Sequence, residues 1–310
     1  MQSVVKVSVV MCTYNGVQFI NEQIDTILKQ DYPIYELIIV DDRSIDDTWN
    51  RLLDWQKKDD RIQLYQNEQN LGYNKNFEKA IGLTTGDVIA IADQDDIWMP
   101  AKIRKQVESL QFPEVLLSHT RSVRLQNGRL RYKSASLHHH YKGNDTSKLF
   151  MFNQINGHDM MFKKELIPKF MPVPEGMMYD WWIAINATCY GTIASIDEFL
   201  VHHRIHDHNS FFTGKPQSIG QPDLIEFLGM FATIPVLHVK DRNFLSELIQ
   251  QIKRHNHYHP GSFDKTFFKF LYKNGNILFG HKKRWIPLLN YFKSAMKYAR
   301  MDYKGRGISI

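Results

Sequence analysis

Four short apolar runs, separated by segments with helical periodicity, constrain this chain more than any other feature. They span residues 6–12, 35–40, 61–65 and 88–92. Each has the length and composition of a buried strand, whereas the intervening segments place apolar residues on one helical face. Regular alternation of strands and helices with short loops predicts an α/β fold built on a Rossmann-like, mostly parallel, doubly wound sheet.

Polar residues follow every one of these runs. Thr13 and Asn15 follow the first, Asp42 the second, Asn70 the third and Asp93 the fourth. Ligands of doubly wound sheets bind beyond the carboxyl ends of the strands. Each residue also has a local explanation, as a turn residue or a helix cap. Their occurrence after all four runs nevertheless predicts one shared binding rim.

The fourth run ends in three carboxylates within four positions, namely Asp93, Asp95 and Asp96. Carboxylates this close repel one another, so a divalent cation is the simplest expected partner. Oxygen ligands with open positions suit Mg²⁺ or Mn²⁺. The alternative is a solvated loop in which Asp95 or Asp96 caps the next helix. That helix is expected over 99–110, with Lys102 facing solvent.

Five motifs resemble those of the family 2 glycosyltransferases of the GT-A fold. They are VVMCTYNG at 9–16, IVDDRSIDDT at 39–48, NLGYNKN at 70–76, GD at 86–87 and ADQDDIW at 92–98. The DQDDIW form is similar to that of bacterial rhamnosyltransferase-like enzymes of surface polysaccharide assembly. Together with the later segments described below, these motifs extend in order over roughly the first 210 residues.

The resemblance implies a nucleotide-diphosphate-sugar donor on the predicted rim. Thr13 and Asn15 would lie beside the nucleotide, and Asp42 would bond the base or ribose. Asn70 and Lys75 would approach the ribose and the diphosphate.

The resemblance also gives the carboxylates roles. Asp93 and Asp95 match the family's Asp-x-Asp motif, whose second carboxylate usually binds the metal. Asp96 would be a cap or a sugar contact. The chemistry agrees, because a divalent ion stabilises the negative charge that develops on a departing diphosphate.

Asp180 precedes an apolar helix and matches the family's catalytic position. An inverting transfer needs a general base that takes the proton of the attacking hydroxyl. Many relatives have Glu-Asp where this chain has Tyr179 and Asp180, which leaves one carboxylate for the task. Asp180 would also serve as a helix cap. Trp181 and Trp182 are expected either in the core or as walls of the acceptor pocket.

Two later segments complete the expected site. Residues 156–162 resemble the strand that lines the sugar and acceptor pocket, which places Gly157 there. Residues 201–209 resemble a Tyr-Arg-x-His-x-x-Asn stretch. His206 is therefore a candidate metal or diphosphate ligand, supported by Arg204 in the pocket.

The sequence predicts a GT-A catalytic domain over 1–215 and a helical C-terminal region over 216–310. The nucleotide-binding half would cover 1–98 and the acceptor half 99–215. Strands are expected at 114–119, 121–125, 192–197 and 199–203.

The C-terminal region is strongly basic. Residues 240–310 hold 15 Lys and Arg against 4 Asp and Glu, a balance of +11 within a total of +6. These helices could pack on the catalytic domain or form a homodimer. Alternatively, basic and aromatic faces could hold the chain on an anionic membrane surface, near a lipid-linked acceptor. Nucleic acid is the weaker expectation.

Two cysteines without zinc spacing indicate a reducing compartment. No apolar run approaches the roughly 18 residues of a membrane span. The expected location is cytoplasmic, peripheral on the inner face of the cell membrane.

The leading hypothesis is an inverting, metal-dependent glycosyltransferase. The favoured reaction moves rhamnose from dTDP-rhamnose to a hydroxyl of a bacterial surface-glycan or lipid-linked acceptor, and this detail comes from the resemblance alone. A nucleotidyltransferase is the alternative, but it usually has a Gly-rich basic loop after the first strand, unlike residues 13–16. A catalytically inactive GT-A-like protein that binds a membrane or a partner is the third hypothesis.

Overall fold

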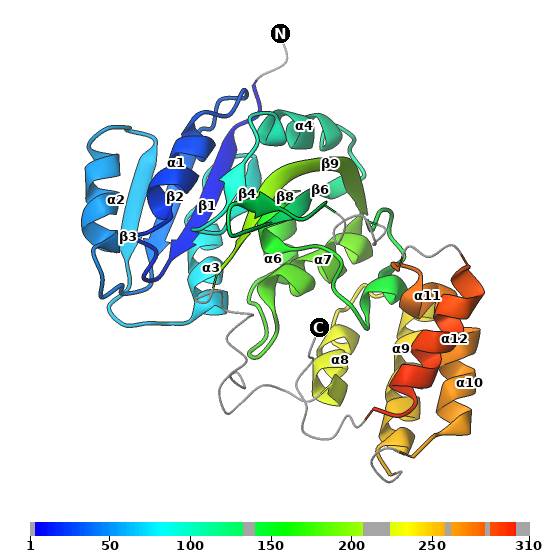
Figure 1. The fold of residues 1–310 in the computed structure, drawn as a ribbon. Helices are drawn as coiled ribbons and strands as arrows, with labels where there is room; N and C mark the ends of the chain where they lie inside the picture. The colour runs from blue at the N-terminus through cyan, green and yellow to red at the C-terminus, as the bar shows by residue number, and fades with distance from the viewer. Residues whose placement is uncertain (1–3, 133–139, 207–223, 258–261, 283–285, 302–310) are drawn as a thin grey trace.

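The computed structural model describes residues 4–132, 140–206, 224–257, 262–282 and 286–301. A single mixed sheet with helices on both faces forms the larger part, and helices α8–α12 lie to one side of it (Figure 1). The sheet has the strand order β3-β2-β1-β4-β8-β6-β9-β5, with β7 paired to β6. The predicted α/β class is confirmed.

The first four strands are parallel and follow the apolar runs of the sequence. They are β1 Val7–Thr13, β2 Glu36–Asp41, β3 Ile62–Gln66 and β4 Val88–Ala92. Every residue of β2 and β4 is buried, which explains why these strands show no alternation of polar and apolar residues. β1 lies between β2 and β4, so the strand order reverses beside it. Doubly wound sheets bind their ligands at such a reversal, beyond the carboxyl ends of the strands.

Three connecting helices cover the two faces of these strands. They are α1 Ile20–Leu28, α2 Thr48–Gln56 and α3 Tyr73–Gly82. Ile20 and Ile24 of α1 join Val9 in one core, whereas Phe77 of α3 joins Val10 in the other. Neighbouring residues of β1 thus point into different cores, and each buried aliphatic side chain stabilises the fold by about 1.5–3 kcal/mol.

The second half of the sheet is mixed. Its elements are β5 Ile97–Trp98, α4 Lys102–Ser109, β6 Val115–Gln126, β7 Arg129–Leu130, η1 Thr146–Leu149, η2 Gly157–Asp159, β8 Met160–Lys163, η3 Lys164–Leu166, α6 Ile167–Phe170, α7 Tyr179–Tyr190 and β9 Thr192–Ile205. β6 and β9 each replace two shorter predicted strands. The pairing of β6 with β9 contains register shifts, one of them between His119 and Arg121, where the sequence predicts a break between two strands. Such irregularities let one long strand continue through the break.

Lys102 corrects a second expectation, because its side chain is fully buried instead of facing solvent. Its ammonium lies 3.7 Å from the centre of the Trp98 ring and donates a 3.1 Å hydrogen bond to Gln106. Burial lowers the pKa of Lys102 to about 7, although the charges of Asp159 and Asp96 oppose this shift. The aromatic face and the nearby carboxylates make this interior position tolerable for a lysine.

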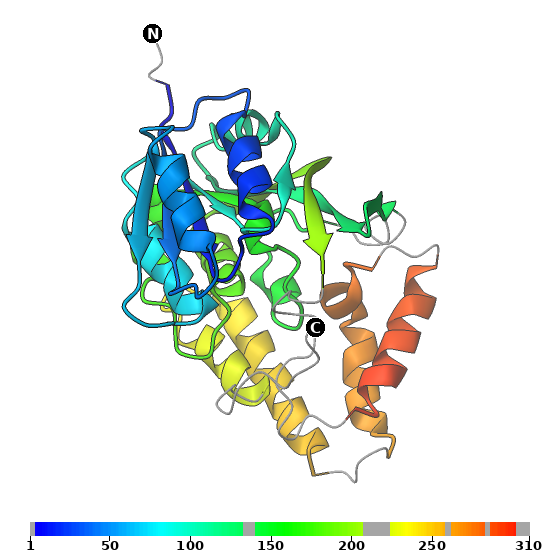
Figure 2. The same ribbon diagram turned by 60° about the vertical axis from the view of Figure 1, so that its left-hand side comes forward.

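The C-terminal helices are α8 Leu224–Ala232, α9 Val239–His255, α10 Lys265–Lys273, α11 Gly275–Phe279 and α12 Pro287–Tyr298. Figure 2 shows them below the sheet, with α10, α11 and α12 grouped at one side. Phe227 and Phe231 of α8 pack on Trp181 of α7, so these helices share a core with the sheet. The predicted domain boundary at 215 lies outside the described residues. In the described segments, none of the helices combines the length and apolarity of a bilayer span.

Candidate active site

The loops after β1, β2 and β4 are tied together at the carboxyl edge of the sheet. The Thr13 hydroxyl donates to the Asp41 carboxylate at 3.0 Å, and the Asp42 amide donates to the Thr13 carbonyl at 2.7 Å. Gln94 brackets Tyr14, accepting from its amide at 3.0 Å and donating to its carbonyl at 3.1 Å. The predicted rim therefore exists as a connected set of loops.

Asp42 holds the loop that follows β3. Its buried carboxylate accepts hydrogen bonds from the Asn67 side chain at 2.7 Å, the Leu71 amide at 2.8 Å and the Gly72 amide at 2.9 Å. Gly72 has a φ of 78°, which favours glycine. Asn70 is part of the same loop and donates to the Asp42 carbonyl at 3.2 Å. Asp42 and Asn70, which the sequence predicts as nucleotide contacts, therefore also hold the loops of the rim in place.

Asn15 and Lys75 lie on the exposed side of this rim. Asn15 has a φ of 50°, and its side-chain oxygen accepts from the Ile45 amide at 2.9 Å, so it joins the first two loops. The Lys75 ammonium pairs with Glu78 at 2.8 Å. Such an exposed pair contributes little stability.

Four side chains at the end of β4 gather around one point. They are Asp93, Asp96, His158 and His203, and one ligand atom of each lies within 4.8 Å of the others. Strand pairing explains this cluster. β8 runs antiparallel to β4, so the residues before β8 meet those after β4. β5 pairs with β9, with Ile97 opposite His202, which brings Asp96 beside His203.

The two histidines of the cluster stack face to face. Their ring centres are 4.5 Å apart with an angle of 6° between the planes. His158 Nδ1 lies 3.3 Å from Asp93, and His203 Nδ1 lies 3.1 Å from Asp96. Burial would lower the pKa of His158, but the carboxylates of Asp159, Asp96 and Asp93 outweigh it and raise the pKa to about 10. Burial would raise the pKa of Asp93. The hydrogen bond from His158 and the attraction between the two groups outweigh burial and hold the pKa of Asp93 below its usual value.

Asp96 is an internal member of this cluster. One carboxylate oxygen accepts from His203 and, at 3.1 Å, from the Arg204 amide. The other is buried and has no hydrogen-bond partner among the described residues. The side chain is fully buried, and Ala101 caps α4. Asp96 is therefore not the helix cap that the sequence suggested, and the expected sugar contact stays a prediction.

Asp95 forms a second pairing, with His206. Its carboxylate lies 2.8 Å from His206 Nε2, and the His206 ring stacks on Phe19 at 4.6 Å. Arg204 donates to the Asp95 carbonyl at 2.9 Å. Burial raises the pKa of Asp95 to about 6, with further contributions from the charges of Asp96 and Asp93. The structure thus brings together the predicted Asp95, His206 and Arg204.

Asp180 lies in the first turn of α7 and faces the same rim. Its carboxylate accepts from the Trp181 amide at 2.7 Å. Burial raises the pKa of Asp180 to about 6, and the charge of Asp93 adds to the shift whereas that of His158 opposes it. This coupling connects Asp180 electrostatically to the carboxylate cluster. A side chain with such a pKa is ionised at neutral pH and can still accept a proton.

Gly157 is confined by the residue that precedes Asp180. A Cβ atom at Gly157 would lie 2.0 Å from the Tyr179 hydroxyl oxygen. The ring of Tyr179 stacks on Phe77 of α3 with centres 4.5 Å apart. The small residue therefore permits close contact between η2 and the start of α7.

Trp181 and Trp182 are core residues. Trp181 is fully buried and donates to the Leu149 carbonyl at 2.6 Å, and Trp182 donates to the Phe170 carbonyl at 2.7 Å. Their indoles pack among helices in the core, which is the first of the two expected positions, and the role as a pocket wall stays a prediction.

The motifs in the sequence do not single out His158, His203 or Gln94 as site residues. Each lies inside a segment that the motifs cover, but only pairing of distant strands brings the histidines to the carboxylates. No local periodicity could signal that contact.

The donor sets fit a divalent cation. Carboxylate oxygens and imidazole nitrogens suit Mn²⁺, and carboxylates suit Mg²⁺. The buried Asp96 oxygen accepts no hydrogen bond from the described residues, and it is the kind of atom that a cation satisfies. Both Asp95 with His206 and the four-residue cluster could supply ligands.

Comparison with known proteins identifies the family of this arrangement. The family described as "Glycosyl transferase family 2" matches residues 8–179. An uncharacterized glycosyltransferase of Methanocaldococcus jannaschii is 31% identical over 218 residues, which cover 67% of this chain and 73% of the relative.

Two solved structures share the fold. Residues 1–349 of TarS from S. aureus, in complex with UDP-GlcNAc, align with a TM-score of 0.62 and 17% identity, covering 94% of this chain and 81% of that one. The mannosyltransferase PcManGT from Pyrobaculum calidifontis, in complex with GDP-Man and Mn²⁺, aligns with a TM-score of 0.55 and 17% identity, covering 96% and 70%. These neighbours confirm the predicted GT-A fold.

Proposed function

Because the chain belongs to glycosyl transferase family 2, we propose that this glycosyltransferase works with inversion and depends on a divalent metal. One observation carries the proposal. The carboxylate and histidine groups at the end of β4 share a rim with Asp180, whose pKa of about 6 suits a general base. A nucleotide-diphosphate-sugar would bind at this rim, and an acceptor hydroxyl would approach Asp180.

The proposed reaction uses these positions. The acceptor oxygen attacks the anomeric carbon while its proton passes to the Asp180 carboxylate. The bond from that carbon to the diphosphate breaks on the opposite face, and its electron pair leaves with the nucleoside diphosphate. With a pKa of about 6, roughly nine-tenths of Asp180 is ionised at pH 7 and ready to take the proton.

The metal would be held by Asp95 and His206, with Asp93 nearby. When bound, a divalent ion stabilises the charge that develops on the leaving diphosphate. The Asp95 and His206 side chains are 11% and 19% exposed, so this pair is open to ligands, whereas Asp96 is enclosed. Arg204 supports the site by fixing the Asp95 backbone and pairing with Glu22 at 2.5 Å.

Donor and acceptor complete the proposal. dTDP-rhamnose remains the favoured donor from the sequence, and UDP- and GDP-sugars are the competing classes because the structural neighbours bind them. The acceptor would be a hydroxyl of a bacterial surface glycan, carried on a lipid at the inner face of the cell membrane. The apolar lipid anchor of such an acceptor makes the membrane surface the place of reaction.

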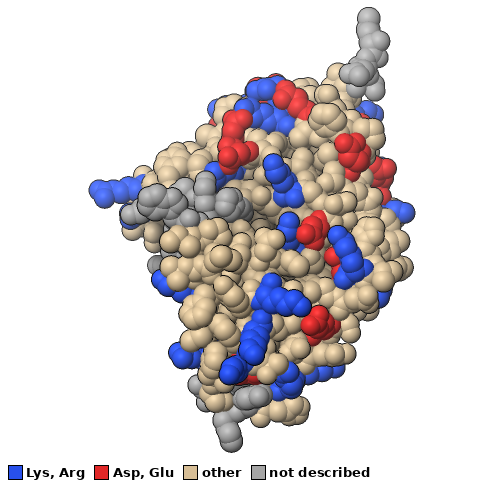
Figure 3. Space-filling model, turned by 90° about the vertical axis from the view of Figure 1, so that its right-hand side faces the viewer, with Lys and Arg blue, Asp and Glu red and all other residues tan. Residues whose placement is uncertain are grey.

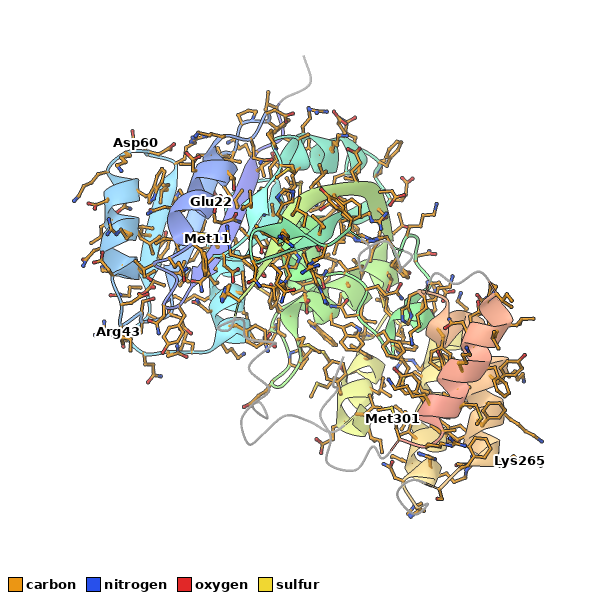
Figure 4. The ribbon with its side chains drawn as sticks, viewed as in Figure 1. Met11, Glu22, Arg43, Asp60, Lys265 and Met301 are labelled. Carbon is orange, nitrogen blue, oxygen red and sulfur yellow. The ribbon has the colours of Figure 1, made fainter. Side chains whose placement is uncertain are left out.

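Thermal-shift measurements with a panel of nucleotide-sugars, with and without Mn²⁺, test the donor and the metal together. We expect one donor class to raise the Tm in the presence of Mn²⁺, and Asp95→Asn to abolish that metal-dependent increase. Asp60→Asn, on an exposed loop far from the rim, is the matched control (Figure 4). If no nucleotide-sugar shifts the Tm, or if Asp95→Asn responds like the control, the proposal is wrong.

A further inference from the structure

The two last long helices present an apolar surface to solvent. Its exposed members, which we call the α10–α12 face, are Phe263 (39% exposed), Tyr272 (39%), Ile286 (61%), Leu288 (64%), Leu289 (46%) and Phe292 (45%). These six large apolar side chains lie on α10 and α12 or just before them. Exposed apolar groups that gather in one place, rather than singly, indicate a surface that contacts a partner or a membrane.

Aromatic contacts make this face continuous across the two helices. Phe268 of α10 stacks parallel to Tyr272 with ring centres 6.0 Å apart. Phe292 of α12 meets both rings edge-on, at 5.4 Å from Phe268 and 6.2 Å from Tyr272. Phe263 extends the row, with its ring centre 5.4 Å from that of Phe268. The helices therefore expose a joined apolar strip.

Basic side chains run beside this strip at helical spacing. The exposed ones are Lys265, Lys269 and Lys273 on α10, with Lys293, Lys297 and Arg300 on and just after α12. Each helix repeats its basic residues every three or four positions, which places them along one side. Lys265 begins α10 at the end of the molecule remote from the sheet (Figure 4).

Acidic side chains are almost missing from these helices. In the described residues 262–282 and 286–301 the one acidic residue is Asp264, which is fully buried. It caps α10 through the amides of Thr266 and Phe267 and lies 3.3 Å from His255. The space-filling view from this side shows basic side chains spread among uncharged ones, with few acidic groups in the lower half (Figure 3).

We propose that the α10–α12 face docks on an anionic lipid bilayer. The apolar strip would enter the headgroup boundary while the flanking lysines contact lipid phosphates. A second copy of the chain is the less suitable occupant, because protein interfaces are depleted in lysine whereas membrane-surface helices are enriched in it. The proposed function explains why such docking would be useful, because it would bring the rim to a lipid-linked acceptor, and only this explanation rests on that function.

Vesicle co-sedimentation tests the docking directly. The wild-type chain should bind phosphatidylcholine vesicles that contain phosphatidylglycerol, bind pure phosphatidylcholine vesicles much less, and dissociate as salt rises. Each lysine near an anionic surface contributes about a fivefold factor, so Lys293→Glu with Lys297→Glu should weaken binding at least about 25-fold. Leu288→Ser with Leu289→Ser should weaken it even at low salt.

Lys57→Glu with Lys58→Glu, on an exposed turn after α2, is the matched control and should bind like the wild type. Equal binding to both vesicle types, or equal loss in control and test variants, would overturn the inference. So would a dimer, measured by sedimentation velocity, that the leucine substitutions dissociate. Metal-dependent donor binding by thermal shift should stay unchanged in every variant, so failure of the docking and failure of the proposed reaction are distinguished.

Discussion

Replacing Asp180 with Asn should stabilise the protein while removing its activity. Asp180 lies half-buried on the rim, and its partial burial raises its pKa from 3.8 to about 6. A carboxyl that is harder to ionise in the folded state than in the unfolded state destabilises the fold once both states are ionised. For this difference the cost at pH 7 is about 3 kcal/mol. Asn carries no charge and keeps an oxygen that can accept from the Trp181 amide.

The sign and the pH window follow from proton binding. Between about pH 4 and pH 6 the folded state binds more protons than the unfolded state, so the wild-type stability falls as pH rises through this range. The free energy of unfolding of Asp180→Asn should therefore exceed that of the wild type by about 3 kcal/mol at pH 7 and by about half of that at pH 5. The difference should vanish once Asp180 is protonated in both the folded and the unfolded state.

Urea unfolding followed by tryptophan fluorescence, in EDTA at several pH values from 5 to 8, measures this difference. Transfer by the same variant should fall by a factor of about 10² to 10⁴, the usual contribution of a general base, with donor binding retained. A variant that is less stable than the wild type at pH 7, or whose advantage does not vary with pH, would refute the assigned environment. Unchanged turnover would refute the role as base.

Three further substitutions test the packing around the rim. Lys102→Met should raise the Tm at pH 7, and the difference in Tm should disappear as pH rises toward 10. Burial lowers the pKa of Lys102 to about 7, so the buried charge destabilises the wild type less as the unfolded state also loses its proton. A difference in Tm that does not depend on pH would contradict this. Gly157→Ala should cost about 1–3 kcal/mol through contact with the Tyr179 hydroxyl, and adding Tyr179→Phe should recover part of it in urea titrations; no recovery would place the strain elsewhere. Trp181→Ala should lower the free energy of unfolding by about 3–5 kcal/mol, because the indole fills the core under α8. A change in KM for the acceptor without loss of stability would instead indicate that Trp181 forms a wall of the acceptor pocket.

The sequence by itself determined the parallel half of the sheet and the rim at its edge. Apolar runs and helical periodicity are local patterns, and the polar residue after each run reaches the carboxyl edge whatever the rest of the chain does. Thr13, Asp42 and Asp93 are therefore readable from position alone, as is the carboxylate group that ends β4.

Only the tertiary structure decided which side chains meet those carboxylates. His158 reaches Asp93 because β8 pairs antiparallel with β4, and His203 reaches Asp96 because β5 pairs with β9. Lys102 is buried because Trp98 and distant carboxylates surround it, against the solvent-facing position that its helix period predicts. Pairing between distant strands and burial of charge depend on the summed free energy of the whole fold, which no local stretch of sequence contains.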